Sequence, residues 1–317
     1  MEKPRILFMG TPRFALPSLQ VVIEREETVV GVVTQPDRPS GRGQQVVMPP
    51  VKELAMRHNL PVYQPLKVRD QHFIQKVQAL APDLIVVVAF GQILPRALLD
   101  IPPRGCINVH ASLLPAYRGA APINWALING ETVTGVTIML LDEGMDTGDI
   151  LLQKAVSILP EDTAAKIHDR LAESGAVLLG EALDELRSNG WKRIPQDHTQ
   201  ATYAPLMKKE DGCIAWSKSA REIHNQVRGM NPWPGCFTFF RGKLLKIYHT
   251  GVLEKNEGAI PGKITSVGDD GIEIATGNGA LLIQELQIEG KKKMPAGDFI
   301  KGQGIRAGEE FTSQRVV

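Results

Sequence analysis

The chain has 317 residues, of which 43% are hydrophobic and 22% are charged, a composition typical of a soluble globular protein. Its length favours two domains over one, and its formal net charge of +1 argues against a polycation. The three cysteines, Cys106, Cys213 and Cys236, form no CxxC pair, which argues against a structural zinc site and a disulfide framework.

The cysteine usage and the hydropathy predict a cytoplasmic protein. Widely spaced, unpaired cysteines fit a reducing compartment. Only a short apolar run lies in the first residues, MEKPRILFMG, which is unlike a signal or transit peptide. No stretch approaches the roughly 20 apolar residues that cross a bilayer. We expect a monomer, since no feature calls for a larger assembly.

Strand-like and helix-like segments alternate through the first half of the chain. Buried strands are predicted at 5–10, 28–35, 61–65, 83–91, 105–112 and 134–142. Helices are predicted at 14–24, 51–59, 70–80, 121–129 and 163–188. This alternation predicts an α/β domain with a doubly wound, mostly parallel, Rossmann-like sheet.

The second half of the chain has a different pattern. A polar segment with two prolines, 190–209, is typical of a linker. A helix is predicted at 219–229, and the β-rich pieces that follow it are punctuated by glycine turns, which indicates a small OB-like β-barrel. We therefore predict a catalytic domain over 1–189, a linker over 190–209 and a C-terminal barrel over 210–317.

An amide, an imidazole and a carboxylate form the candidate catalytic group. Asn108 and His110 lie two residues apart at the end of a predicted parallel strand, so they share one face where α/β sheets bind ligands. Asp146 follows the next strand in a Gly-Met-Asp-Thr-Gly turn. A buried polar cluster is the plainer interpretation of Asn-x-His alone. Together the three groups suit acyl-type transfer, with an oxyanion donor, a proton carrier and an orienting carboxylate.

The transfer is predicted to be direct, because no serine or cysteine lies in a nucleophile-elbow motif. Leu113 and Leu114 are apolar residues in a loop beside the candidate catalytic group, and they suit the wall of a slot for a flat aromatic ligand. Phe90 and Gly91 end the neighbouring strand and would add backbone hydrogen-bonding groups to that slot.

A basic, glycine-rich loop follows the second strand. Its residues of interest are Arg38, Gly41, Arg42 and Gly43. The loop is either a plain surface connection or an element that reaches a phosphate backbone or bases. The exposed pair Lys208 and Lys209 would extend a positive track across the second domain.

The segment 107–151, INVHASLLPAYRGAAPINWALINGETVTGVTIMLLDEGMDTGDIL, strongly resembles the folate-dependent formyltransferases. The Asn-x-His pair, the Ser-Leu-Leu-Pro loop and the later aspartate are the signature of that superfamily. The MGTP start, the QPDRPSGRG loop, the NPWPG segment and the β-rich C-terminal part resemble the members that formylate methionyl initiator tRNA. This resemblance covers essentially the whole chain.

The resemblance implies 10-formyltetrahydrofolate as co-substrate, without a metal, and methionyl initiator tRNA as acceptor. It implies catalytic roles for Asn108, His110 and Asp146, and tRNA binding by the C-terminal barrel and Arg42. It also implies a folate-contacting loop formed by Ser112, Leu113, Leu114, Pro115 and Ala116. Ala116 and Tyr117 stand where other members often carry basic or aromatic residues.

Four other functions compete with this interpretation. A formyltransferase that acts on a sugar-nucleotide amine would share the catalytic group but would not need the basic loop. A formate-releasing hydrolase would not need that loop either. A nicotinamide oxidoreductase is disfavoured because the first β–α turn, MGTPRFALPSL, lacks GxGxxG. A non-catalytic RNA-binding protein would not explain the presence of Asn108, His110 and Asp146.

Overall fold

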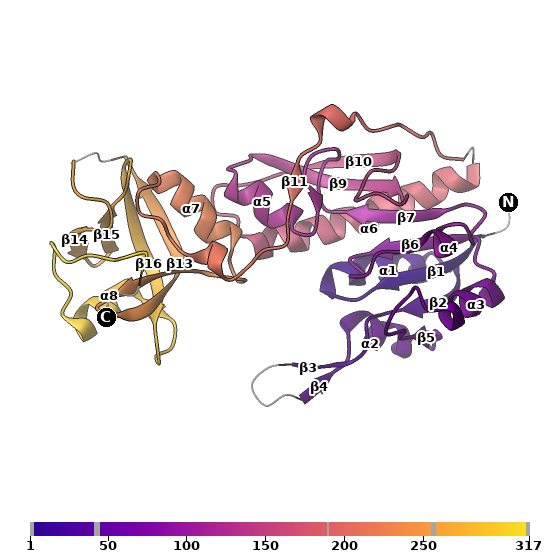
Figure 1. The fold of residues 1–317 in the computed structure, drawn as a ribbon, viewed down its shortest axis with the longest axis horizontal. Helices are drawn as coiled ribbons and strands as arrows, with labels where there is room; N and C mark the ends of the chain where they lie inside the picture. The colour runs from indigo at the N-terminus through magenta and orange to yellow at the C-terminus, as the bar shows by residue number, and fades with distance from the viewer. Residues whose placement is uncertain (1–2, 41–44, 189, 255–257, 315–317) are drawn as a thin grey trace. The chain divides into compact units, whose positions relative to one another are not determined.

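The computed structural model describes residues 3–40, 45–188, 190–254 and 258–314. The chain forms two compact units, each with a sheet of its own (Figure 1). The first unit comprises Met1–Pro122, Val133–Ser157 and His168–Ala204, and the second comprises Ile123–Thr132, Ile158–Ile167 and Pro205–Val317. Within the described ranges, no helix is long and apolar enough to cross a membrane.

The first unit is built on a seven-stranded sheet with the order β10-β9-β7-β6-β1-β2-β5. Its strands are β1 (Arg5–Gly10), β2 (Thr28–Val33), β5 (Val62–Tyr63), β6 (Leu84–Val88), β7 (Cys106–His110), β9 (Val133–Leu140) and β10 (Ile150–Ser157). Strands β7, β6, β1, β2 and β5 are parallel, whereas β9 is antiparallel to both of its neighbours. The predicted α/β fold with a mostly parallel sheet is confirmed.

Helices bury both faces of this sheet. They are α1 (Leu16–Glu24), α2 (Pro50–Arg57), α3 (Gln71–Leu80), α4 (Arg96–Leu99) and most of α6 (Ala164–Ser188). On one face, Cys106 of β7 joins a core cluster with Phe73 of α3 and Leu98 of α4. On the other face, α6 approaches so closely that a Cβ on Gly175 would lie 2.8 Å from Val109 of β7. Because alternate strand residues point to opposite faces, this packing orients the whole of β7.

Several short elements of the first unit were not predicted from the sequence. They are α4, β10, the hairpin of β3 (Arg38–Ser40) and β4 (Gln45–Val47), and the pair of β8 (Arg118–Gly119) and β11 (Tyr203–Ala204). Strand β10 is an edge strand that is largely exposed beyond Leu151, so it carries no long apolar run. Two-residue strands are too short to show any period. Segment 190–204, which the sequence assigns to a linker, contributes β11 and the turn His198–Gln200 to the first unit.

The second unit contains an antiparallel sheet with the order β12-β13-β16-β15-β14. Its strands are β12 (Cys236–Phe240), β13 (Lys243–Leu253), β14 (Ile264–Gly268), β15 (Gly271–Ala275) and β16 (Ala280–Ile288), with β17 (Met294–Pro295) beside β16. Thr312 bridges to Phe239 of β12, and Glu310 bridges to Lys263, which precedes β14. The chain end therefore links the two edge strands, as the predicted barrel requires.

Helices α7 (Ala220–Gly229) and α8 (Ala296–Gln303) accompany this sheet, together with α5 (Pro122–Ile128) from its second residue onward. Ser219 caps α7 by accepting from the Glu222 backbone, and the Glu222 side chain accepts in return, which completes a capping box. Three aromatic rings, Phe240, Phe299 and Phe311, pack edge to face in the core.

Candidate active site

Strand β7 carries the first two candidate catalytic residues to the carboxyl edge of the first sheet. Cys106 faces the core cluster formed with α3 and α4, so Asn108 and His110 lie on the same face in the strand alternation. Asn108 is half-buried and pairs with Val87 of β6, and His110 is buried at the last position of the strand. Strand β7 thus carries an amide and an imidazole on one face, two residues apart.

Asp146 is brought to the imidazole of His110 across 36 residues of sequence. Its Oδ2 lies 3.7 Å from His110 Nδ1, and the two side chains are only 16% and 6% exposed. On the other side of the ring, His110 Nε2 lies 3.1 Å from the carbonyl oxygen of Tyr117. A carbonyl only accepts, so Nε2 carries a proton and donates it. Nδ1 is therefore the ring nitrogen that faces the carboxylate of Asp146.

The carboxylate of Asp146 is held by the backbone of the loop opposite. Its Oδ2 accepts a hydrogen bond of 2.8 Å from the N–H of Gly119. Asp146 itself has a left-handed backbone, with φ of 53°. Such a conformation costs a non-glycine residue about 1 kcal/mol or more and is kept only where surrounding contacts determine it.

The loop that follows β7 is fixed by two polar side chains that the sequence did not single out. Thr137 of β9 donates to the carbonyl oxygen of Ser112 at 2.7 Å and accepts from the N–H of Leu114 at 3.1 Å. Gln153 of β10 donates to the carbonyl oxygen of Leu114 at 2.8 Å. Only the tertiary fold brings these residues to the loop, so no local pattern could have identified them.

The proposed folate-contacting residues divide into buried and accessible ones. Ser112 is fully buried, and its hydroxyl donates to the carbonyl oxygen of Ala116 at 2.6 Å. Leu114 packs with Met139 in a small core cluster. Leu113, Pro115 and Ala116 are only partly buried and remain near the surface of the loop. Three of the five loop residues assigned to folate contact are therefore accessible, and two are buried.

The end of β6 forms the other side of this edge. Phe90 is buried, and its carbonyl oxygen accepts hydrogen bonds from Thr11 at 3.1 Å and from Gln35 at 3.3 Å. Ala89 and Gly91 are exposed and have positive φ angles of 46° and 88°. The turn after β6 therefore displays backbone at the surface while the buried Phe90 anchors it.

The base of the basic loop is braced within the first unit. Asp37 accepts from Lys52 at 2.7 Å and from Gln64 at 2.8 Å, and these hydrogen bonds hold the pKa of its carboxyl below the usual range. Arg38 is exposed at the start of β3 and donates to Gln35 at 3.3 Å. Gln35 thus contacts both Arg38 and the carbonyl of Phe90.

The other residues proposed to bind tRNA fall into two groups. Gly41, Arg42 and Gly43 lie outside the described residues. Lys208 and Lys209 are exposed and belong to the second unit, where Asp211 accepts from the N–H of Lys208 at 2.7 Å.

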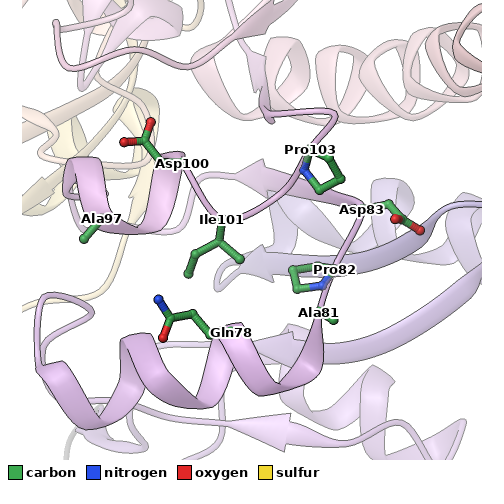
Figure 2. A pocket seen from close by; sticks show the side chains of 8 residues that line it. All are labelled: Gln78, Ala81, Pro82, Asp83, Ala97, Asp100, Ile101 and Pro103. Atoms are coloured by element: carbon green, nitrogen blue, oxygen red, sulfur yellow. The ribbon is translucent and has the colours of Figure 1, made fainter.

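A separate hollow lies at the opposite edge of the first sheet (Figure 2). It is lined by the end of α3, the turn into β6, α4 and the turn before β7, with Gln78, Asp83 and Ile101 among its residues (Figure 2). These residues precede the amino ends of β6 and β7, whereas α/β sheets bind ligands beyond the carboxyl ends. Across the described part of the chain, no three His, Cys, Asp or Glu side chains form a group that could hold a metal ion.

Gly148, two residues after Asp146, is expected to tolerate no side chain. A Cβ there would overlap the carbonyl oxygen of Leu140, whose N–H is tied to the carbonyl of Asp149 at 2.9 Å. We expect Gly148→Ala to lower the free energy of unfolding by about 1–3 kcal/mol, because overpacking shifts backbone. Denaturant titration of the purified variants measures this loss.

The matched control is Gly180→Ala in α6. A Cβ at Gly180 would meet only ordinary contacts with Arg25, the nearest at 3.5 Å, and alanine favours helix over glycine by about 1 kcal/mol. The control should be neutral or stabilising. A Gly148→Ala variant as stable as Gly180→Ala would show that the turn is looser than its contacts indicate.

Two family models match this chain. The model named formyl transferase covers residues 4–183, and the model named formyl transferase, C-terminal domain, covers residues 206–304. Methionyl-tRNA formyltransferase of Citrifermentans bemidjiense is 57% identical over 308 residues, which is 97% of this chain and 96% of that protein.

Solved structures share the fold at low sequence identity. HypX from Aquifex aeolicus, in complex with tetrahydrofolic acid, has a TM-score of 0.61 at 20% identity, covering 94% of this chain and 47% of HypX. WlaRD, a sugar 3N-formyl transferase solved with dTDP and 5-N-formyl-THF, has a TM-score of 0.66 at 19% identity, covering 92% of this chain and 100% of WlaRD.

The two family models, which together cover most of the chain, define a formyl transferase. Within that class, the near-full-length identity of 57% shows that the chain belongs to the methionyl-tRNA formyltransferase family.

Proposed function

We propose that this protein transfers the formyl group of 10-formyltetrahydrofolate to the α-amino group of methionyl initiator tRNA. The product, N-formylmethionyl-tRNA, serves translation initiation. Two observations support the proposal. His110 Nδ1 lies 3.7 Å from Asp146 Oδ2, with Asn108 two residues before His110 on the same strand, and the chain is 57% identical to a methionyl-tRNA formyltransferase.

The amine is proposed to attack the formyl carbon directly. Cys106 begins β7 and Ser112 lies in the loop after it, and neither of these two potential nucleophiles is poised to act. Burial raises the pKa of the Cys106 thiol to about 12, and the fully buried Ser112 donates its hydroxyl proton to the carbonyl of Ala116. A thiol with that pKa is not a thiolate at neutral pH, so a covalent enzyme intermediate has no support from these residues.

The catalytic group then has three tasks. The bond between the amine nitrogen and the formyl carbon forms, and charge develops on the formyl oxygen. The Asn108 amide and the Nδ1 proton of a protonated His110 donate to that oxygen. The distance of 3.7 Å from Nδ1 to Asp146 exceeds a hydrogen bond, so this proton is available to substrate. Asp146 supports the imidazolium and accepts the proton that the attacking amine loses, directly or through a water. The carbonyl then re-forms as the bond between the formyl carbon and folate N10 breaks, and N10 leaves with the proton that Asp146 had accepted.

One assay tests the function as a whole. Purified protein, 10-formyltetrahydrofolate and methionyl initiator tRNA should yield N-formylmethionyl-tRNA at a rate proportional to enzyme. Uncharged initiator tRNA and a sugar-nucleotide amine serve as comparison acceptors, and both should yield no formylated product. Faster formylation of the sugar-nucleotide amine than of methionyl-tRNA would replace this proposal with its rival.

Arg42 is proposed to bind the acceptor tRNA. Losing one arginine contact to nucleic acid costs about 1–3 kcal/mol, so Arg42→Ala should raise the KM for methionyl-tRNA about 5- to 150-fold. The KM for folate should not change, and the tRNA KM should rise steeply with salt if phosphates are contacted. Steady-state kinetics with each substrate varied in turn measure these constants.

The matched control for that change is Arg104→Ala. Arg104 is exposed before the amino end of β7, opposite the catalytic edge of the sheet. It should leave both KM values as in the unaltered protein. An equal loss of folate affinity in Arg42→Ala would contradict a specific role in tRNA binding.

A further inference from the structure

Arg118 is a buried charge beside the candidate active site. It is only 2% exposed and is among the largest fully buried side chains of the protein. Its guanidinium donates to Gln196 Oε1 from Nε at 3.1 Å and from Nη2 at 2.6 Å, and Nη2 also donates to His198 Nδ1 at 3.1 Å. Burying a charge is costly unless it is well hydrogen-bonded, so this arrangement is a built feature rather than a chance contact.

Gln196 connects this charge to the backbone of the turn at residues 144–148, called the catalytic turn because it contains Asp146. Its Nε2 donates to the carbonyl oxygens of Asp146 at 2.9 Å and Gly148 at 2.7 Å. Arginine can only donate and carbonyls can only accept, so the amide can adopt no other orientation. Glutamine has an acceptor and two donors at the end of one side chain, which is the set that this position requires.

The catalytic turn is therefore held at two points. Gln196 fixes the main chain of Asp146, whose φ is 53°, and the N–H of Gly119 fixes its carboxylate at 2.8 Å. Both holding groups depend on the same segment of chain, because the N–H of Arg118, next to Gly119, donates to the carbonyl of Thr202 at 2.8 Å. Gln196 and Thr202 both lie in the segment that the sequence assigned to a linker.

We infer that Gln196, oriented by Arg118, is a positioning residue that keeps the Asp146 carboxylate opposite His110 Nδ1 during formyl transfer. The inference rests on the proposed function. Gln196 touches only the backbone of the turn, so its loss should lower kcat without weakening either substrate. Displacing a catalytic group by about 1 Å can reduce the rate by about 10².

The deciding variant is Gln196→Glu, which has the same size and shape. It keeps an acceptor for Arg118 and even supplies a carboxylate, but it loses both donors to the carbonyls of Asp146 and Gly148. If Gln196 serves only to satisfy Arg118, kcat should stay at the wild-type value. If it positions Asp146, we expect kcat to fall roughly 10- to 100-fold with both KM values changed less than about twofold.

The matched control is Gln200→Glu, the same substitution at an exposed side chain of the same segment. A second variant, Gln196→Asn, keeps the neutral amide but is one methylene shorter, so it cannot reach Arg118 and both carbonyls together. It should show the same loss of kcat, and it decides the question if Gln196→Glu does not fold. Melting temperatures establish which variants are folded.

Hydrogen exchange of the Gly119 amide gives a readout that needs no activity. This N–H donates to Asp146 Oδ2, so its exchange should accelerate in Gln196→Glu and Gln196→Asn but not in Gln200→Glu. If the unaltered protein formylates methionyl-tRNA and folded Gln196 variants match Gln200→Glu in kcat and in exchange, the inference is overturned. If Gly119 exchange responds but the unaltered protein does not formylate methionyl-tRNA, the proposed function fails and the clamp on Asp146 stands.

Discussion

Replacing Asp146 by asparagine is expected to lower kcat by at least about 10², because the change removes the negative charge that faces His110 Nδ1 at 3.7 Å. The fold should survive, since the asparagine oxygen can still accept from the N–H of Gly119. Single-turnover formylation of methionyl-tRNA measures the chemical step, and a thermal melt confirms folding.

The control for this prediction is Glu143→Gln. Glu143 is an exposed carboxylate in the same turn, three residues before Asp146, and it pairs with exposed Arg96 at 3.8 Å. Its loss removes a like charge from the turn and should leave kcat within about twofold, since exposed pairs contribute little. A folded Asp146→Asn enzyme with turnover near that of Glu143→Gln would remove Asp146 from the mechanism.

Replacing Asn108 by alanine is expected to lower kcat by about 10²–10³, the usual effect of deleting one oxyanion donor. Asn108 is the half-buried middle residue of β7, on the same face as His110. Because it would donate mainly to charge that develops in the transition state, both KM values should change little. Steady-state kinetics for folate and for methionyl-tRNA separate kcat from KM.

Asn108→Asp is the matched variant for this prediction. It preserves the size of the side chain but replaces the NH2 donor with an acceptor that repels an oxyanion, so it should be at least as slow as Asn108→Ala. The opposite pattern, a raised KM for folate with kcat within about threefold of wild type, would make Asn108 a binding residue and not an oxyanion donor.

Local sequence patterns predict much of the candidate catalytic group. The all-apolar run of β6 and the alternation along β7 follow from the geometry of an extended chain in a parallel sheet, and the structure confirms both strands. The spacing of two residues is enough to predict that Asn108 and His110 share one face of the strand. The position of that face at the carboxyl edge follows from the parallel order of β6 and β7.

The residues that hold the candidate catalytic group in place could not be predicted from local sequence patterns. Thr137 and Gln153 reach the loop at Ser112–Leu114 from β9 and from β10, an edge strand whose pattern the sequence did not reveal. Gln196 lies 50 residues after Asp146, in a segment without hydrophobic period. Its contacts depend on how the returning chain pairs β11 with β8, which is a matter of chain path and not of local preference.

The sequence alone determined the α/β class and the β-rich second half, and it proposed the residue types of the catalytic group. These properties follow from periods of two or 3.6 residues and from side-chain chemistry. Only the tertiary structure places Asp146 Oδ2 at 3.7 Å from His110 Nδ1 and His110 Nε2 beside the carbonyl of Tyr117. It also brings Gln196, from the segment predicted to be a linker, into a hydrogen bond with the carbonyl of Asp146. Hydrogen bonds are short and directional, so partners distant in sequence can be assigned only when the whole chain path is known.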